Sequence, residues 1–391
     1  MFSGEGLKVA KRLSKIAPFR VMELLARANE LASLGHDVIH LEVGEPDFDT
    51  PAPIVAAGVR AISEGKTRYT DARGTPQLRQ TISEFYKFSL GIDVRANQIF
   101  VTAGASGGLL MLSALLLNPG ENLLMPDPGY PCNRHFLSSF NAEGLLVPVD
   151  ATQNYQLTPS LVEEYWTPAT RGILVASPSN PTGSILGQKA VIELGKVVRD
   201  KDGVMIVDEI YQGLVYENEA TGSALAQVPD VIVINSFSKY FGMTGWRLGW
   251  VVVPEAIAKD LEKLAQNLFI CPSSIAQEAA LSAFDPESIA TMEAQKEEFA
   301  ARRDYLVPAL RALGFEIPLM PAGAFYVYAG LPDEAPNAEQ FCHLLLENHF
   351  VAVTPGTDFG FHNADRFIRL SYARNLSQLK EAVYRIGKLL G

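Results

Sequence analysis

A lysine stands among serine, glycine and arginine residues directly after a stretch that reads as a buried strand. The stretch 231–234 is continuously apolar, and the segment 236–249 that follows it reads Ser-Phe-Ser-Lys-Tyr-Phe-Gly-Met-Thr-Gly-Trp-Arg-Leu-Gly. A lysine amine can form a Schiff base with an aldehyde, and lysine is a usual covalent anchor for pyridoxal phosphate, PLP. The phosphate of PLP could be bound by polar residues of the same segment, Ser236, Ser238 and Arg247. Taken alone, Lys239 could equally be a solvated loop lysine.

Polar side chains also follow two other runs that read as strands. Asn180 and Asp208 each come shortly after a continuous apolar run, and the three positions Asn180, Asp208 and Lys239 are about 30 residues apart, roughly one strand and one helix. Because ligands bind beyond the carboxyl ends of strands in open α/β sheets, we expect these side chains at one edge of a sheet. Asp208 could keep the pyridine nitrogen of PLP protonated, while Asn180 and Tyr211 could hydrogen-bond its ring oxygen. Individually, Asp208 could be a helix cap and Asn180 part of a turn.

Several motifs, in this order along the chain, resemble those of the class I/II aminotransferases, the fold-type I PLP enzymes related to aspartate aminotransferase. They are Ser-Asn-Pro-Thr-Gly at 179–183, Asp-Glu-x-Tyr at 208–211, Ser-Phe-Ser-Lys with Gly-x-Arg-x-Gly at 236–249, and Arg-Leu-Ser-Tyr at 369–372. The resemblance extends from Gly44 to the C-terminus. It implies an α/β protein of fold-type I architecture, with a large domain built on a mostly parallel seven-stranded sheet flanked by helices and a smaller α+β domain.

The resemblance also implies roles for residues of the cofactor site. A glycine-rich turn, 103–108, stands between a strand-like run and an apolar helix, and Ala105 and Ser106 in it would bind the PLP phosphate. Tyr130 resembles the aromatic residue that stacks on the pyridine ring. Tyr69 resembles a tyrosine that reaches the phosphate held by the other subunit, which implies a homodimer with shared active sites.

Further residues are assigned to the substrate in the same way. Arg369 would bind the α-carboxylate, since a buried arginine needs an anionic partner, and Gly44 would lie against the same group together with Asn180. Lys239, Asp208 and Tyr211 form the expected catalytic set, with Lys239 as both Schiff-base residue and proton shuttle. The implied reaction is ping-pong transfer of an amino group from an L-amino acid to a 2-oxo acid.

The identity of the amino donor is less clearly indicated. The helix 107–117 carries no charge, and Phe19 stands where many relatives have a small hydroxyl residue, so an apolar or aromatic donor is favoured over a dicarboxylic one. The positive charge of Arg20 beside Phe19 instead favours a dicarboxylic donor. A PLP-dependent lyase or decarboxylase of the same fold, for example a carbon–sulfur β-lyase, is an alternative, and a non-catalytic PLP-binding regulatory module is a remote one.

Composition excludes several other classes of protein. The 391 residues carry a net charge of −11, so there is no basic character typical of nucleic-acid binding. No apolar run has the length of a membrane span, and no signal peptide is present. The three cysteines are widely scattered, and no histidine pattern typical of a metal site occurs. We therefore expect a cytoplasmic protein that binds no metal, no nucleic acid and no membrane.

The order of the predicted elements divides the chain into two domains. Alternating strand and helix patterns fill residues 45–290, which we expect to form the large PLP-binding domain. Residues 291–391, together with the N-terminal residues 1–44, are expected to form a discontinuous small domain.

Overall fold

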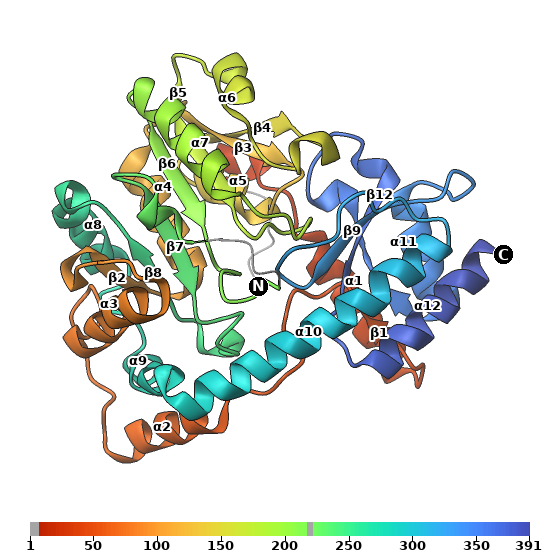
Figure 1. Ribbon diagram of the computed structural model, residues 1–391, viewed down its shortest axis with the longest axis horizontal. Helices are drawn as coiled ribbons and strands as arrows, with labels where there is room; N and C mark the ends of the chain where they lie inside the picture. The colour runs from red at the N-terminus through yellow and green to blue at the C-terminus, as the bar shows by residue number, and fades with distance from the viewer. Residues whose placement is uncertain (1–7, 217–221) are drawn as a thin grey trace.

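The computed structural model describes residues 8–216 and 222–391, and its larger part is built on a seven-stranded sheet (Figure 1). In spatial order the strands are β2 (Ile99–Thr102), β8 (Gly249–Val252), β7 (Ile232–Ser236), β6 (Val204–Asp208), β5 (Thr170–Ala176), β3 (Asn122–Asp127) and β4 (Glu143–Pro148). Only β8 runs antiparallel to its neighbours, β2 and β7. The predicted mostly parallel seven-stranded sheet is therefore confirmed.

Helices cover both faces of this sheet, which is why its strands are apolar at successive positions. In β2, Val101 packs in one core cluster with Leu78 of α3 (Pro76–Leu90), whereas Phe100 packs in a second cluster with Leu109 of α4 (Gly104–Leu116) and Leu261 of α8 (Glu255–Leu268). Successive side chains of a strand thus enter opposite layers. The helices of this part are α2 (Ala52–Ser63), α3 (Pro76–Leu90), α4 (Gly104–Leu116), α5 (Pro131–Ser138), α6 (Pro159–Tyr165), α7 (Gln188–Asp200), α8 (Glu255–Leu268) and α9 (Ser274–Leu281).

The smaller part contains two short sheets and lies beside the carboxyl ends of the larger sheet's parallel strands. An antiparallel sheet has the order β11 (Thr354–Pro355), β12 (Phe367–Ser371) and β9 (Tyr326–Gly330). Near it, β1 (Ile39–His40) pairs in parallel with β10 (Val351–Ala352), so the N-terminal segment lies against the C-terminal part. The helices here are α1 (Arg20–Ser33), α11 (Ala338–His349) and α12 (Leu376–Leu390).

The long helix α10 (Pro286–Ala312) runs along both parts of the molecule (Figure 1). Near its start Met292 packs into the core of the larger part, and Phe299 and Leu306 pack into the core of the smaller part. The predicted domain limits, 45–290 against 1–44 and 291–391, stay a prediction, and residues 1–7 lie outside the described residues.

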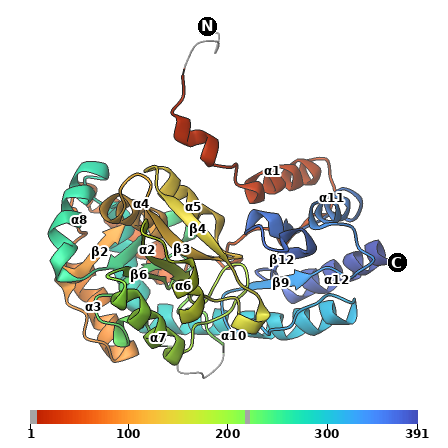
Figure 2. The same cartoon turned by 90° about the horizontal axis from the view of Figure 1, so that it is seen from above.

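Short 3-10 helices complete the described chain: η1 (Lys11–Lys15), η2 (Ala96–Gln98), η3 (Ala151–Gln153), η4 (Ala224–Ala226), η5 (Thr244–Trp246), η6 (Ser282–Phe284), η7 (Gly356–Asp358) and η8 (Ala364–Arg366). Of the described residues before α1, η1 lies against α5, and the residues that precede η1 point away from the body of the molecule (Figure 2). Within the described ranges, no helix combines the length and the apolar character that crossing a membrane requires.

Candidate active site

A cavity of about 270 Å³ lies where the carboxyl ends of β5, β6 and β7 face the smaller part. Its wall brings together all but one of the site residues predicted from the sequence: Phe19, Gly44, Ala105, Ser106, Tyr130, Asn180, Asp208, Tyr211, Ser236, Ser238, Lys239, Arg247 and Arg369. The exception is Tyr69, whose side chain is 81% exposed and is not part of the cavity wall.

The register of the parallel strands explains why residues distant in sequence meet here. Ala176 at the end of β5 pairs with Asp208 at the end of β6, and Asp208 pairs with Ile234 of β7. The loops that leave these three strands therefore begin side by side, and they carry Asn180 and Lys239 to the same edge of the sheet.

Lys239 is held toward the centre of the cavity. Its Nζ donates a hydrogen bond to the carbonyl oxygen of Gly44 at 2.6 Å. Burial lowers the pKa of Lys239 to about 8, and the positive charges of Arg369 and Arg247 act in the same direction, while Glu45 opposes them. An amine with a pKa of about 8 is neutral in about a tenth of the molecules at pH 7, far more often than an ordinary lysine, and the neutral form can act as a nucleophile and as a base.

Asp208 lies at the floor of the cavity with only 4% of its surface exposed. Its Oδ1 accepts a hydrogen bond from the Ile210 N–H at 3.1 Å. Burial raises the pKa of the Asp208 carboxyl to about 6, and the Ile210 N–H and the charge of Lys239 limit the shift. A buried carboxylate of this kind would bind a protonated ring nitrogen, because the opposite charge compensates the cost of burial.

Tyr211 follows on the same turn and is buried. Its hydroxyl is 2.8 Å from the hydroxyl of Tyr326, so the two phenols form a pair at the cavity wall. Tyr326 was not singled out in the sequence as a site residue, because a tyrosine in a strand reads as core. Its effect on the site is nevertheless direct, since a Cβ at Gly44 would lie 2.2 Å from the Tyr326 hydroxyl. Only glycine therefore fits at position 44.

One end of the cavity is rich in groups that bind anions. The helix α4 begins here, its N-cap Ala103 supplies no side-chain hydrogen bond, and Ala105 and Ser106 belong to its first turn. The hydroxyls of Ser236 and Ser238 are 2.9 Å apart. Uncapped N–H groups at a helix N-terminus and serine hydroxyls together suit a phosphate.

Arg247 completes this anion-binding end. Its Nη1 donates to the carbonyl oxygen of Thr244 at 3.0 Å and lies 3.5 Å from Ser238 Oγ. Gly104 has a φ of +68°, and a Cβ there would lie 2.7 Å from Arg247 Nη2, so the glycine turn and the guanidinium are in close contact. No carboxylate of the described chain forms an ion pair with Arg247. The donor set of this end matches the phosphate of PLP in charge and in hydrogen bonding.

The opposite end of the cavity holds a buried cation. Arg369, 2% exposed, donates from Nη1 to Asn180 Oδ1 at 3.0 Å and from Nη2 to the carbonyl oxygen of Glu42. Its guanidinium lies over the rings of Tyr326 and Phe359, 4.4 and 4.7 Å from their centroids. Its Nε has no hydrogen-bond partner, and among the described residues no carboxylate forms an ion pair with it. A buried arginine with an unused donor indicates an anionic ligand.

Part of the cavity wall, which we call the roof, consists of the apolar side chains of Phe19, Val21, Met22, Val43 and Leu109. Phe19 meets the ring of Tyr130 edge-on, with the ring centroids 6.2 Å apart. Val21 and Met22 of α1, Val43 and Leu109 also line the cavity, with Met22 55% exposed, and none of these four was predicted as a site residue. No signal in the sequence distinguishes them from ordinary core positions, because an apolar side chain at helical spacing reads the same in both places.

Arg20 does not enter the cavity. Its guanidinium pairs with Glu339 of α11, and its backbone N–H donates to Asp358 Oδ1 at 3.3 Å. Arg20 is therefore paired within the chain and is not part of the cavity wall. In the described ranges, no group of three or more histidine, cysteine, aspartate or glutamate side chains is arranged to hold a metal ion.

Comparisons with known proteins agree with this geometry. Residues 36–386 match the family model described as aminotransferase class I and II. The chain is 38% identical to the (5-formylfuran-3-yl)methyl phosphate transaminase of Methanocaldococcus jannaschii over 98% of this chain and 99% of that protein. It is 36% identical to the valine–pyruvate aminotransferase of Mycobacterium tuberculosis over 96% of this chain and 97% of that protein.

Solved structures give the same result. A crystal structure of an aminotransferase from Mycobacterium tuberculosis superposes with a TM-score of 0.95 at 35% identity, covering 98% of this chain and 99% of that one. The aspartate aminotransferase of Thermus thermophilus, solved with maleate, superposes with a TM-score of 0.92 at 32% identity, covering 98% and 100%. The family match over residues 36–386 and the shared fold over nearly the whole length lead to one assignment: the chain belongs to the class I and II aminotransferases and is a PLP-dependent enzyme.

Proposed function

We propose that this aminotransferase takes its amino group from an apolar or aromatic L-amino acid. The observation that carries the proposal is the composition of the cavity roof, where the side chains of Phe19, Val21, Met22, Val43 and Leu109 are all apolar. A substrate side chain that points to this roof gains by leaving water, whereas a carboxylate there would lose its hydration without a partner.

The charged residues of the cavity support the same preference. In the described part of the chain the cavity wall has three lysine or arginine side chains, Lys239, Arg247 and Arg369. Each has a proposed partner already: the cofactor aldehyde, the phosphate and the α-carboxylate. Since Arg20 is paired with Glu339, no further cation remains in this wall for a distal carboxylate.

The proposed roles of the polar residues follow from their positions. PLP supplies, when bound, an electron-withdrawing ring that stabilises negative charge at the substrate α-carbon. Asp208 would hold the proton on the pyridine nitrogen, with Asn180 and Tyr211 beside the ring oxygen and Tyr130 against the ring face. Ala105, Ser106, Ser236, Ser238 and Arg247 would hold the phosphate.

The substrate is positioned by the other end of the cavity. Arg369 would bind the α-carboxylate with Asn180 and the Gly44 backbone, which fixes the orientation of the α-carbon relative to Lys239. The Lys239 amine, whose pKa burial lowers to about 8, would take the proton from that carbon. An amine with the ordinary lysine pKa of about 10.4 would be almost wholly protonated at neutral pH and unable to do so.

The names of the relatives favour transamination over the lyase and decarboxylase alternatives, since those compared here are transaminases or aminotransferases. They do not agree on the donor. One is named for valine and pyruvate, and another, from Pyrococcus horikoshii, for aspartate at 34% identity. The choice between an apolar and a dicarboxylic donor therefore rests on the cavity itself.

A panel of amino donors tests the proposal. With PLP and a fixed 2-oxo acid acceptor, we expect kcat/KM for leucine, valine or phenylalanine to exceed that for aspartate and glutamate by at least about tenfold, the effect of an uncompensated charge in an apolar site. Formation of the new 2-oxo acid is the readout, with ammonia release measured in parallel. Faster turnover of aspartate would overturn the donor assignment, and ammonia release would indicate lyase chemistry.

We further propose that the active unit is a homodimer with shared sites. Tyr69 is exposed and lies outside the cavity of its own chain, while Arg247 at the phosphate end is itself exposed to solvent. A second copy of the chain that places its Tyr69 hydroxyl on this phosphate would complete the site. Apolar side chains on α2, Val55, Val59 and Ile62, are also exposed and would become buried in such a contact.

A cytoplasmic location is proposed as well. Cys132, Cys271 and Cys342 are free thiols, as expected where thiols are kept reduced.

A further inference from the structure

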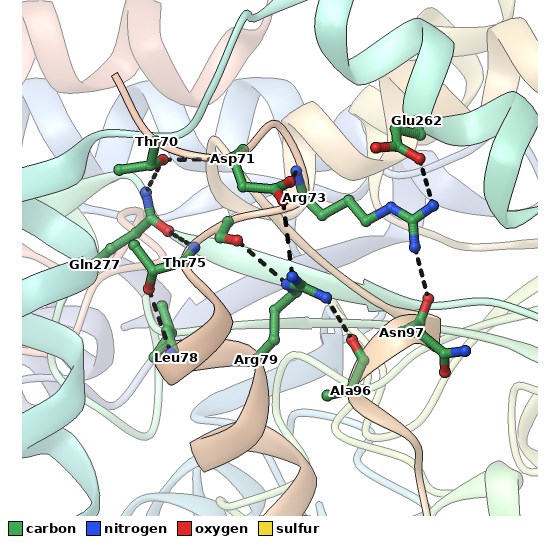
Figure 3. Close-up of polar contacts among 11 residues, drawn as sticks. Thr70, Asp71, Arg73, Thr75, Leu78, Arg79, Ala96, Asn97, Glu262 and Gln277 are labelled. Carbon is green, nitrogen blue, oxygen red and sulfur yellow. Dashed lines mark hydrogen bonds and ion pairs between the residues drawn. The ribbon is translucent and has the colours of Figure 1, made fainter. Parts of the chain in front are cut away.

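The loop that carries Tyr69, residues 68–75, is held by a buried glutamine on a neighbouring helix (Figure 3). Gln277 of α9 is 0% exposed. Its Nε2 donates to Thr70 Oγ1 at 3.1 Å, and its Oε1 accepts from the Thr75 N–H at 2.6 Å. One side chain therefore joins both ends of the loop and fixes the distance between them.

Two arginines bind the middle of the loop to neighbouring elements of the larger part (Figure 3). Arg73 pairs with Glu262 of α8 and donates to the Asn97 carbonyl oxygen at 3.2 Å. Arg79 of α3 donates to the carbonyl oxygens of Gly74 and Ala96, at 3.2 and 3.1 Å. The loop is thus tied to three separate elements of the large part.

The backbone of the loop has little freedom to move. The Val101 N–H donates to the Arg73 carbonyl oxygen at 2.9 Å, which joins the loop to β2. Gly74 has a φ of +93°, and a Cβ there would lie 2.4 Å from Val101 Cγ2, so only glycine fits at this contact. Asp71 Oδ1 accepts the Arg73 N–H at 2.8 Å and closes a turn within the loop.

Tyr69, one residue before Thr70, contrasts with this order because 81% of its surface is exposed. An aromatic side chain that is presented on a fixed backbone loses less conformational entropy on binding than one on a mobile loop. The contacts within the chain hold the backbone of the loop and leave the Tyr69 side chain available for binding.

We propose that Gln277 is a positioning residue for cofactor binding in the partner subunit, acting through Tyr69. The inference rests on the proposed homodimer with shared sites. Gln277 fixes Thr70, Thr70 fixes the backbone next to Tyr69, and the Tyr69 hydroxyl reaches the phosphate bound by the second copy of the chain. Loss of the Gln277 contacts widens the range of positions that the hydroxyl samples and so weakens the contact with phosphate.

A double-mutant cycle on the homodimer tests the inference. Tyr69→Phe removes the hydroxyl and should raise the Kd for PLP about ten- to hundredfold, as expected for a hydrogen bond to a charged group. Gln277→Leu and Thr70→Val should each raise it about three- to tenfold when Tyr69 is present. In the Tyr69→Phe background the same two changes should alter the Kd by less than about twofold, because the contact through which they act is already absent.

The matched control is Thr81→Val, whose hydroxyl donates to Gln77 within α3 and does not contact the loop. It should leave PLP binding unchanged. Equal effects of Gln277→Leu and Thr70→Val in both Tyr69 backgrounds, or no effect with Tyr69 present, would show a merely structural role and overturn the inference. If Gln277→Leu does not fold, Thr70→Val decides alone. If instead Tyr69→Phe itself leaves PLP binding unchanged, the shared-site proposal fails, which is a separate outcome.

Discussion

Arg369 illustrates how a single residue defines the ligand of this cavity. A fully buried guanidinium costs free energy unless charge and hydrogen bonds compensate it. Here two carbonyl-type oxygens, of Asn180 and Glu42, and two aromatic rings supply part of that compensation, and Nε is left without a partner. The missing part is an anion, and a carboxylate fits the planar guanidinium best.

Replacement of Arg369 should separate substrate binding from cofactor binding. We expect Arg369→Ala to raise KM for the amino donor and to lower kcat/KM by a factor that corresponds to about 2–5 kcal/mol of lost transition-state stabilisation. This is the usual effect of removing one partner of a buried, charge-assisted contact. PLP retention, measured by cofactor absorbance, should change little, because other residues form the proposed phosphate site. Arg369→Lys should have a KM and a kcat/KM between those of the wild type and those of Arg369→Ala. Unchanged KM in Arg369→Ala would place the carboxylate site elsewhere.

Glu209, next to Asp208, is a titratable residue that has no role in the proposed reaction. It is 2% exposed, and its Oε1 accepts the Ala224 N–H at 2.7 Å. Burial raises the pKa of Glu209 to about 7, although the hydrogen bonds from Ala224 and Ser223 oppose the shift. Since the folded-state pKa is above the unfolded value, the folded protein binds more protons between about pH 4.5 and pH 7.

The stability of the apoprotein should consequently fall as pH rises through this range. Glu209→Gln removes the charge and keeps an oxygen for the Ala224 N–H, so it should be more stable than the wild type at pH 8 by about 2 kcal/mol and similar at pH 5. Urea denaturation midpoints at several pH values provide the measurement. Glu163→Gln, at an exposed position, is the control and should follow the wild-type profile. A parallel shift of Glu209→Gln at every pH would show that Glu209 does not titrate in this range.

At the scale of elements, α1 and its contacts decide what the cavity roof is made of. The Asp358 carboxylate accepts the Arg20 N–H at the start of α1, and Arg27 donates to both carboxylate oxygens of Glu347 at 2.8 and 2.7 Å. Ala28 and Leu31 pack in a small core cluster of their own with Leu346 of α11 and Ala352 of β10. These contacts hold the helix in place, so that Phe19, Val21 and Met22 reach the cavity.

A change at the start of α1 should therefore alter donor preference more than stability. We expect Phe19→Ser to lower kcat/KM for leucine or phenylalanine about tenfold while kcat/KM for aspartate changes less, because the apolar surface opposite the donor side chain is reduced. Leu34→Ser, at an exposed position beyond the other end of the helix, is the control. An equal loss for both donors would mean that Phe19 supports the fold of the site and does not select the donor.

At the scale of the whole molecule, the proposed phosphate end of the cavity is open to solvent. Arg247 there is exposed, and so are Tyr69 and the apolar side chains Val55, Val59 and Ile62 of α2. Both observations support an assembly in which a second copy covers this surface. A shared site also makes a distinctive prediction about mixtures of inactive variants.

At a PLP concentration too low to load Tyr69→Ala, mixing Tyr69→Ala with Lys239→Ala should restore part of the activity. In a mixed dimer with shared sites, one site carries both defects and the other carries neither, so random exchange of subunits in equal amounts should return about a quarter of the wild-type rate. The measurement is activity after subunit exchange, with each variant mixed with itself as the control. If every Tyr69 serves its own chain, both sites of the mixed dimer remain defective and the mixture stays inactive.

The strand-end residues were predictable because their signals are local. A continuous apolar run predicts a buried strand, parallel strands end at a common edge, and Asn180, Asp208 and Lys239 each follow such a run. The order of these segments, together with the motifs around them, was enough to predict the sheet and most of the polar residues of the cavity wall. The same argument placed Arg369 in the site, since an arginine in an apolar strand needs a partner.

The tertiary structure alone decided the partners of residues whose neighbours are distant in sequence. Arg20 beside Phe19 read as a candidate substrate cation until Glu339 of α11 proved to be its partner. Tyr326, Leu109 and Val43 line the cavity, but an apolar or aromatic side chain has the same pattern in a core and in a ligand site. Periodicity specifies which face of an element is buried, whereas packing between elements determines what that face contacts.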